Sequence, residues 1–342
     1  MRHINIPVFI PHLGCPNQCV FCNQRSISGV EEFDPNSVIS IIEDALSTTT
    51  PEDEVEIAFF GGSFTGIERE LMISLLKIGY SYIDKGKVKS IRCSTRPDYI
   101  SEEILDILET YGVKTIELGL QSSSDLVLES SKRGHNFEAE RVGCKMIVDR
   151  GINLIGQMMI GLPSSDLESE LQTAEFIIQS GASGARIYPT VVFRDTELFD
   201  LAKSGEYLPL NIEDAITRSA LILERFIDAG VDVIRIGLQA SENLSDEKCY
   251  FAGPNHPSLG EYVIGEFYYN KIAKLINEKN ISADDQIIIS VAKGQLSQAI
   301  GQQKRNKNRL TEKHKKIRFV ESESLNDYEI LVEIKNGENK CI

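Results

Sequence analysis

Three cysteines close together near the start of the chain are the side chains best suited to chemistry in this sequence. They are Cys15, Cys19 and Cys22, in the pattern C-x3-C-x2-C. Thiolate is the preferred ligand of iron–sulfur clusters, so three thiolates on one short loop can hold three irons of a cubane cluster. No fourth cysteine lies nearby in the sequence, which leaves one iron open to an external ligand. The pattern therefore predicts an iron–sulfur cluster that can bind a further molecule.

Zinc is the alternative occupant of such a loop, because C-x2-C alone is a common half of a zinc site. Zinc would need a second set of ligands, and the five histidines form no second half-site, although His12 is close enough in sequence to act as a fourth ligand. The chain of 342 residues has seven cysteines, and an odd number in a long chain argues against a secreted disulfide framework. The four scattered ones are expected to be buried structural thiols: Cys93, Cys144, Cys249 and Cys341.

The elements that must position the cysteines alternate regularly between strand and helix. Hydrophobic patterning predicts strands over 4–10, 54–60, 88–94, 113–120, 152–160, 184–190 and 231–237, and helices over 36–47, 67–84, 101–111, 166–179 and 212–229, with two more between 120 and 150. Such alternation predicts an α/β fold with six or seven parallel strands, in the form of a partial TIM-like (β/α)6 barrel. Barrels of this kind carry their chemistry on loops that leave the C-terminal ends of the strands. The cysteines and the segment Gly61-Gly62-Ser63 follow strand ends in this way.

The composition places the chain among ordinary globular proteins. Hydrophobic residues make up 42% and charged residues 25%, with a formal net charge of −15. The acidity argues against a protein that coats nucleic acid or anionic membrane with its whole surface. No apolar run approaches the roughly 20 residues needed to cross a bilayer. The first residues also lack the apolar stretch of a secretory signal, so we expect a cytoplasmic protein.

The cysteine loop resembles the signature of the radical S-adenosylmethionine (SAM) superfamily, in which an aromatic residue, here Phe21, precedes the third cysteine. The resemblance implies a [4Fe–4S] cluster whose open iron is chelated by SAM. The cluster would donate one electron, SAM would break to methionine and a 5′-deoxyadenosyl radical, and the radical would abstract a substrate hydrogen. A small reductant such as flavodoxin or ferredoxin is implied as the electron source.

Gly61-Gly62-Ser63 is similar to the glycine-rich segment whose backbone meets the SAM amino group in that superfamily. Ser63 departs from the glutamate that is common at the third position. The alternative for the two glycines is a plain tight turn.

Further segments resemble, in order, the radical domain of the Elongator catalytic subunit: 117–122, 132–135, 161–163 and 186–190. Parts of this pattern are shared with coproporphyrinogen dehydrogenase. The resemblance implies that Glu117 and Gln121 lie near the ribose and methionine of SAM, with Lys132 and Arg133 on the rim of the site. The alternative for Lys132 and Arg133 is a solvated helix end, where cations are favoured. About a hundred residues follow the barrel, too few for the acetyltransferase domain of that subunit, so its whole reaction is not expected here.

The last part of the chain predicts a second, smaller unit. The turn-rich segment 251–257 separates a radical SAM barrel over 1–250 from an α+β domain over 258–338. The order of predicted elements and the turn Ala299-Ile300-Gly301-x-x-Lys304 resemble a KH RNA-binding domain, in which a G-x-x-G loop grips nucleotide backbone. Here Lys304 stands in place of the second glycine.

Charge supports this comparison. Residues 293–318 hold nine cations and one acid, so this stretch carries +8 and the rest of the chain −23. The candidate RNA contacts are Lys304, Arg305, Lys307 and Arg309. The alternative is that this basic face docks on the acidic barrel.

The sequence as a whole predicts a radical SAM enzyme that acts in RNA or tRNA modification. One alternative is a radical SAM enzyme on a small molecule such as a tetrapyrrole, with the C-terminal domain serving only structure. Another is a non-catalytic iron–sulfur or zinc protein that binds RNA.

Overall fold

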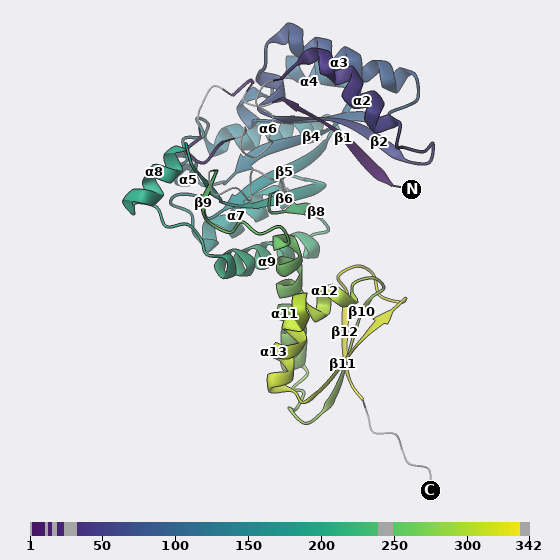
Figure 1. Ribbon diagram of the computed structural model, residues 1–342, viewed down its shortest axis with the longest axis vertical. Helices are drawn as coiled ribbons and strands as arrows, with labels where there is room; N and C mark the ends of the chain where they lie inside the picture. Colours follow the sequence, from purple (N-terminus) through teal and green to yellow (C-terminus); the bar gives the residue numbers. More distant parts are fainter. Residues whose placement is uncertain (1, 11–12, 16–18, 24–32, 239–248, 336–342) are drawn as a thin grey trace.

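The computed structural model of the chain describes residues 2–10, 13–15, 19–23, 33–238 and 249–335. A curved sheet wrapped by helices makes up the larger part, and a smaller unit of three strands and short helices lies at one end of it (Figure 1).

Seven parallel strands form the large sheet, in the spatial order β1-β2-β3-β4-β5-β6-β8. They are β1 (His3–Ile10), β2 (Glu54–Gly61), β3 (Ser90–Thr95), β4 (Val113–Gln121), β5 (Asn153–Ile160), β6 (Gly184–Pro189) and β8 (Asp232–Ile236). The helices between them are α2 (Val38–Leu46), α3 (Arg69–Asp84), α4 (Glu102–Thr110), α5 (Asp125–Ser130), α6 (Phe137–Asp149), α7 (Leu167–Gln179) and α9 (Ile212–Asp228). Neighbouring strands are consecutive in the chain, which is the winding of a partial TIM-like barrel and confirms the predicted fold class.

The two faces of the sheet differ in chemistry. On β2, Ile57 and Phe59 point into the main hydrophobic core with the helices, while the alternate residue Glu56 lies on the opposite face. The same alternation runs along β4, where Ile116 and Leu118 belong to the core. The inner face of the barrel therefore carries buried charge, and the outer face carries the apolar packing that holds the helices in place.

Three small elements near the C-terminal ends of the strands were not expected from the sequence. The strands β7 (Val192–Phe193) and β9 (Tyr250–Ala252) pair antiparallel, and α8 (Glu197–Ser204) follows β7. The strand β9 lies in the segment predicted to be a turn-rich boundary. Strands of two or three residues give too short a pattern to be recognised in a sequence.

The smaller unit has a mixed sheet with β10 in the centre. Its elements are α11 (Leu259–Glu278), β10 (Gln286–Ala292), α12 (Leu296–Ile300), α13 (Arg305–Lys313), β11 (Lys316–Ser322) and β12 (Ile330–Ile334). The strand β10 pairs parallel with β11, through a crossover made by α12 and α13, and antiparallel with β12. The helix α11 packs on both α9 and β12, and one continuous hydrophobic core includes residues of both units.

Within the described residues, no helix is both long enough and apolar enough to cross a membrane.

Candidate active site

The cysteine loop leaves the end of β1 and lies against the segment after β2. Cys19 is buried, Cys15 and Cys22 are half-buried, and the amide of Cys22 donates to the carbonyl of Cys19 over 3.0 Å. The Cys15 sulfur lies 3.6 Å from the Ser63 hydroxyl oxygen. The structure thus brings the predicted cysteines and the predicted glycine-rich segment together. His12, the conceivable fourth zinc ligand, is outside the described residues.

Glycine is required where these two segments meet. A Cβ at Gly62 would lie 2.1 Å from the Leu13 carbonyl oxygen, and one at Gly14 would lie 2.2 Å from the Ser63 carbonyl oxygen. Two backbone bonds join the segments: the Gly62 amide donates to Ile10 over 2.9 Å, and the Ser63 amide donates to Leu13 over 3.3 Å. The glycines therefore do more than turn the chain, because they let two backbones touch beside the cysteines.

The end of α5 holds the other side of the cysteine loop. The amide of Val20 donates to the Ser131 carbonyl over 3.2 Å, and the Arg133 guanidinium donates to the Cys19 sulfur over 3.1 Å. Lys132, between them, is exposed and forms an ion pair with Glu197 of α8 at 2.6 Å. Arg133 is thus a buried neighbour of a cysteine, whereas Lys132 is the solvated cation that the alternative interpretation described.

Phe21 belongs to a small apolar cluster beneath this loop. It packs against the buried side chains of Val20, Val192, Leu198 and Tyr207. The Leu198 amide of α8 also donates to the Val20 carbonyl over 2.8 Å. The unpredicted elements β7 and α8 therefore support the cysteine loop from the side opposite the glycines.

Glu117 lies at the centre of a buried ion-pair network on the inner face of the sheet. Its side chain is 1% exposed and accepts two bonds from Arg186, at 2.8 and 3.0 Å, and one from Arg92 at 3.2 Å. Gln157 donates to it over 2.9 Å. Both carboxylate oxygens are thus engaged inside the protein. The expected SAM contact of Glu117 stays a prediction, and the observed role of the side chain is to neutralise two buried arginines.

Gln121, at the end of β4, combines an unusual backbone conformation with a buried side-chain oxygen that has no partner among the described residues. Its φ of +74° lies in the left-handed region that favours glycine, and the strand is irregular beside it. The side chain is 9% exposed, and its Oε1 atom has no hydrogen-bond partner among the described residues. An unpartnered buried amide oxygen is costly to a protein unless a bound molecule satisfies it.

A buried cluster of polar side chains around Arg96 holds the backbone of Arg133. The Arg96 guanidinium donates to the Arg133 carbonyl over 2.6 Å and is held by Asp98 through two bonds of 2.9 Å. His135 lies 3.3 Å from Arg96 and 3.0 Å from Glu140. Burial lowers the pKa of His135 to about 3 and raises the pKa of the Glu140 carboxyl well above its usual value. His135 lies in the segment 132–135 that the sequence singled out, but its partnership with Glu140 five residues on became visible only in the structure.

The chemistry of the donors fits an iron–sulfur cluster. The described part of the chain contains no group of three or more His, Cys, Asp or Glu side chains arranged to hold one metal ion. A cubane cluster takes one thiolate at each of three irons, so its ligands need not converge on one point.

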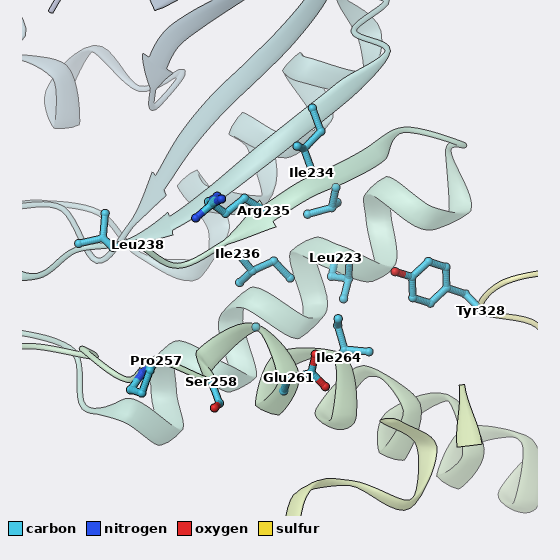
Figure 2. A pocket seen from close by; sticks show the side chains of 12 residues that line it. Leu223, Ile234, Arg235, Ile236, Leu238, Pro257, Ser258, Glu261, Ile264 and Tyr328 are labelled. Atoms are coloured by element: carbon cyan, nitrogen blue, oxygen red, sulfur yellow. The ribbon is translucent and has the colours of Figure 1, made fainter. Parts of the chain in front are cut away.

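A cavity of about 300 Å³ lies away from these residues, between β8, α9 and α11 (Figure 2). Leu223, Arg235 and Ile264 are among its lining residues, and the Tyr328 hydroxyl points into it from the C-terminal unit. Neither the cysteines nor the expected SAM contacts line it. This cavity is therefore separate from the predicted cofactor site.

In the C-terminal unit, the structure divides the candidate RNA contacts into two pairs. Arg305 forms an ion pair with Glu213 of α9, and Arg309 pairs with Glu266 of α11 and lies 3.4 Å from the centre of the Tyr269 ring. Lys304 and Lys307 are exposed. The docking interpretation therefore describes Arg305, whereas Arg309 is paired within the C-terminal unit and the two lysines remain available to solvent.

The turn before α13 keeps an unusual backbone. Gln303 and Lys304 both have positive φ, of 51° and 61°. A Cβ at Gly301 would lie 2.9 Å from the Asn306 side chain, whose amide donates to the Gly265 carbonyl of α11 over 2.6 Å. Lys304 thus adopts a left-handed conformation in which glycine is favoured.

Comparison with known protein families decides the identity of the barrel. A model described as the radical SAM superfamily matches residues 9–177, and a radical SAM C-terminal domain model matches residues 182–268. The chain belongs to the radical SAM superfamily. This confirms the predicted enzyme class, and its cofactors are those of the family, a [4Fe–4S] cluster and SAM.

Within the radical SAM superfamily, the chain is similar to Elongator-type proteins. It is 28% identical over 243 residues to the tRNA uridine(34) acetyltransferase of Methanocaldococcus infernus, covering 59% of this chain and 46% of that protein. It is 26% identical over 254 residues to Elongator complex protein 3 of Homo sapiens, covering 62% and 46%. The chain thus spans about half the length of these relatives. A solved structure of Methanocaldococcus infernus Elp3 lacking its N-terminal segment superposes with a TM-score of 0.58 at 22% identity, covering 82% of this chain and 63% of that one.

Proposed function

We propose that this chain is a cytoplasmic radical SAM enzyme that modifies RNA, with tRNA as the first substrate to test. The observation that carries the RNA part of the proposal is the position of the exposed Lys304–Lys307 turn relative to the barrel. The names of the relatives, which describe tRNA uridine modification, support it.

The turn is attached to the barrel at the edge of the sheet where the strands end. The helix α9 begins at the edge where the strands end, because Leu210, just before it, packs on Gly161 at the end of β5. Glu213 is in the first turn of α9 and forms the ion pair with Arg305. Since Arg305 directly follows Lys304, the basic turn is held near the edge of the sheet that carries the chemistry.

The residues that would hold the cofactors follow from the site. Cys15, Cys19 and Cys22 would bind the cluster, which supplies one-electron reductive cleavage of SAM when both are bound. The backbone of Gly61-Gly62-Ser63 and the unpartnered amide oxygen of Gln121 would face SAM. The apolar cluster around Phe21 would exclude water from the cluster side. A flavodoxin- or ferredoxin-type reductant completes the proposal.

In this arrangement the C-terminal unit contributes binding and orientation. Exposed lysines bind phosphates through charge, without reading sequence, and displace counterions in doing so. Arg305 joins the unit to α9 and Arg309 ties α13 to α11 within the unit, so that RNA bound by the lysines would lie at a defined position relative to the barrel.

Salt-dependent tRNA binding by the reconstituted full-length protein tests the proposal. Affinity falls as salt rises, so the slope of log affinity against log salt is negative. Lys304→Glu and Lys307→Glu should each make this slope shallower by about one. Lys114→Glu is the matched control, because Lys114 is an exposed lysine at the opposite, N-terminal end of β4. Equal slopes in all four proteins would refute RNA binding by this turn. In that case a small-molecule substrate is the remaining candidate for the same radical chemistry.

The nucleosides of tRNA from cells with and without the gene then identify the product. A modified nucleoside that disappears with the gene and returns with the wild-type protein, but not with Cys19→Ala, supports the proposal. Unchanged nucleosides in every RNA fraction contradict it.

A further inference from the structure

Arg235 of β8 lies directly beside a second arginine on the inner face of the sheet. Its Cα partner in the β6–β8 ladder is Arg186, and residues paired in this way point to the same face of a sheet. Burial raises the pKa of Tyr188, and Arg186 and Arg235 both act to lower it, so both guanidiniums lie near the Tyr188 hydroxyl. Like charges opposed on neighbouring strands destabilise each other unless another group neutralises them.

The carboxylates of the inner face neutralise only part of this charge. Arg186 donates to Glu117 over 2.8 and 3.0 Å, and Arg92 pairs with both Glu56 and Glu117. Arg235 forms no ion pair within the part of the chain that the structure describes. Three guanidiniums thus share two carboxylates, so these five side chains carry a net charge of +1. The surplus charge belongs to Arg235.

The arginine pair lies near the proposed cofactor site and is open to the outside at the edge of the sheet. The Arg186 guanidinium lies 5.8 Å from the centre of the Phe60 ring, and Phe60 directly precedes Gly61-Gly62-Ser63. Figure 2 shows the Arg235 side chain pointing toward Leu238, beyond the C-terminal end of β8. Arg235 is half-buried, and β8 is the last strand of the sheet. It also lines the cavity of about 300 Å³ beside β8, so solvent reaches it from the unpaired side of the strand.

We propose that Arg235 binds a phosphodiester group of the RNA substrate, next to the nucleotide that reacts. This rests on the proposed function, because a guanidinium pairs through two parallel hydrogen bonds with a phosphate or with a carboxylate. The phosphate is favoured by the exposed Lys304 and Lys307, which Arg305 and Glu213 attach at the same edge of the sheet. One RNA strand would meet these lysines and Arg235 together. An extruded nucleotide would then place its base inside the barrel and its phosphate at Arg235.

Salt-dependent binding of total cellular tRNA to the reconstituted full-length protein tests this contact. Arg235→Gln should make the slope of log affinity against log salt shallower by about one, whereas Arg235→Lys keeps the charge and should keep the wild-type slope. The double variant with Lys304→Glu should be shallower by about two, because counterions released at separate contacts add. Arg225→Gln is the control, because Arg225 is an exposed arginine in the last turn of α9. Its slope should equal that of the wild type.

The wild-type protein separates the two levels of the proposal. If it binds no tRNA, the proposed function fails and this inference fails with it. If it binds tRNA and the slope is unchanged in Arg235→Gln, the role of Arg235 alone is overturned. Labelling of the wild-type protein by phenylglyoxal, which modifies accessible arginines, decides the question if the glutamine variant does not fold. Bound tRNA should slow labelling of Arg235 but not of Arg225, and equal labelling of Arg235 with and without tRNA overturns the inference. Protection of Arg235 by the carboxylates of coproporphyrin but not by tRNA would show a site for a small acid, which also overturns it.

Discussion

Replacing Gly62 by alanine should release the cysteine loop from the glycine-rich segment without changing any proposed ligand side chain. The added Cβ would lie 2.1 Å from the Leu13 carbonyl oxygen, whereas non-bonded contacts of this kind are at least about 3 Å. The two backbones must therefore separate by about 1 Å. That movement breaks the bonds of the Gly62 and Ser63 amides to Ile10 and Leu13.

The expected magnitude follows from these two hydrogen bonds. At about 0.5–1.5 kcal/mol each, their loss weakens the attachment of the loop by about 1–3 kcal/mol. This free-energy change shifts the equilibrium constant between the attached and the released loop by a factor of about 5 to 150. A displacement of about 1 Å near reacting atoms can itself lower turnover by about 100-fold. Cluster retention and SAM cleavage should therefore both fall, and by more than the overall stability falls.

The assay is iron release to a chelator from anaerobically reconstituted protein, with far-UV circular dichroism as the check on folding. Gly260→Ala is the matched control, because a Cβ there would lie 3.4 Å from the Ile236 carbonyl oxygen, an ordinary contact. A Gly62→Ala protein that releases iron at the wild-type rate would refute the argument that close backbone approach holds the loop.

Three further predictions concern the fold around the site. Glu117→Gln leaves two buried arginines short of a counter-charge and should destabilise the cluster-free protein by about 3 kcal/mol in urea unfolding, whereas an effect under about 1 kcal/mol would contradict the buried network. Burial keeps Glu140 protonated in the folded protein and His135 neutral, so above about pH 6.5 the folded state holds a proton that the unfolded state has lost. Stability should therefore fall as pH rises above about 6.5, by at most about 1.4 kcal/mol per pH unit while Glu140 stays protonated, and Glu140→Gln should remove this slope. Arg305→Glu should increase hydrogen exchange in α13 and lower stability by about 0.5 kcal/mol, and the reversed pair with Glu213→Arg should restore both; no recovery would mean that the pair does not hold the unit.

Much of the barrel could be predicted from the sequence because its signals are local. The strands and crossover helices have long, regular patterns, and a local signal such as Ser101, which caps α4 by accepting from the Ile104 amide, marks where a helix begins. The elements that were missed, β7, β9 and α8, are short and depend on distant contacts: β7 pairs with β9, and α8 bonds to Val20 of the cysteine loop.

The sequence singled out the candidate ligands of the site but not the residues that support them. The cysteine spacing and the glycines stand out in the sequence, because a metal ligand and a close backbone approach each demand one residue type. The contact of Arg133 with Cys19 joins residues 114 positions apart, and the pairing of Arg305 with Glu213 joins residues 92 apart. Such pairings depend on how the helices pack. For the same reason, the sequence could not separate Arg305, which docks on the barrel, and Arg309, which pairs within the C-terminal unit, from the two exposed lysines.

The account depends most on the claim that the cysteine loop holds a cluster that opens SAM by reduction. The direct measurement is the formation of 5′-deoxyadenosine by anaerobically reconstituted protein after reduction with dithionite, together with its iron content. We predict about four irons per chain, and 5′-deoxyadenosine that requires SAM and reductant and is lost in Cys15→Ala, Cys19→Ala and Cys22→Ala. A protein that binds stoichiometric zinc without iron, or a full cluster that yields no 5′-deoxyadenosine, would contradict the account.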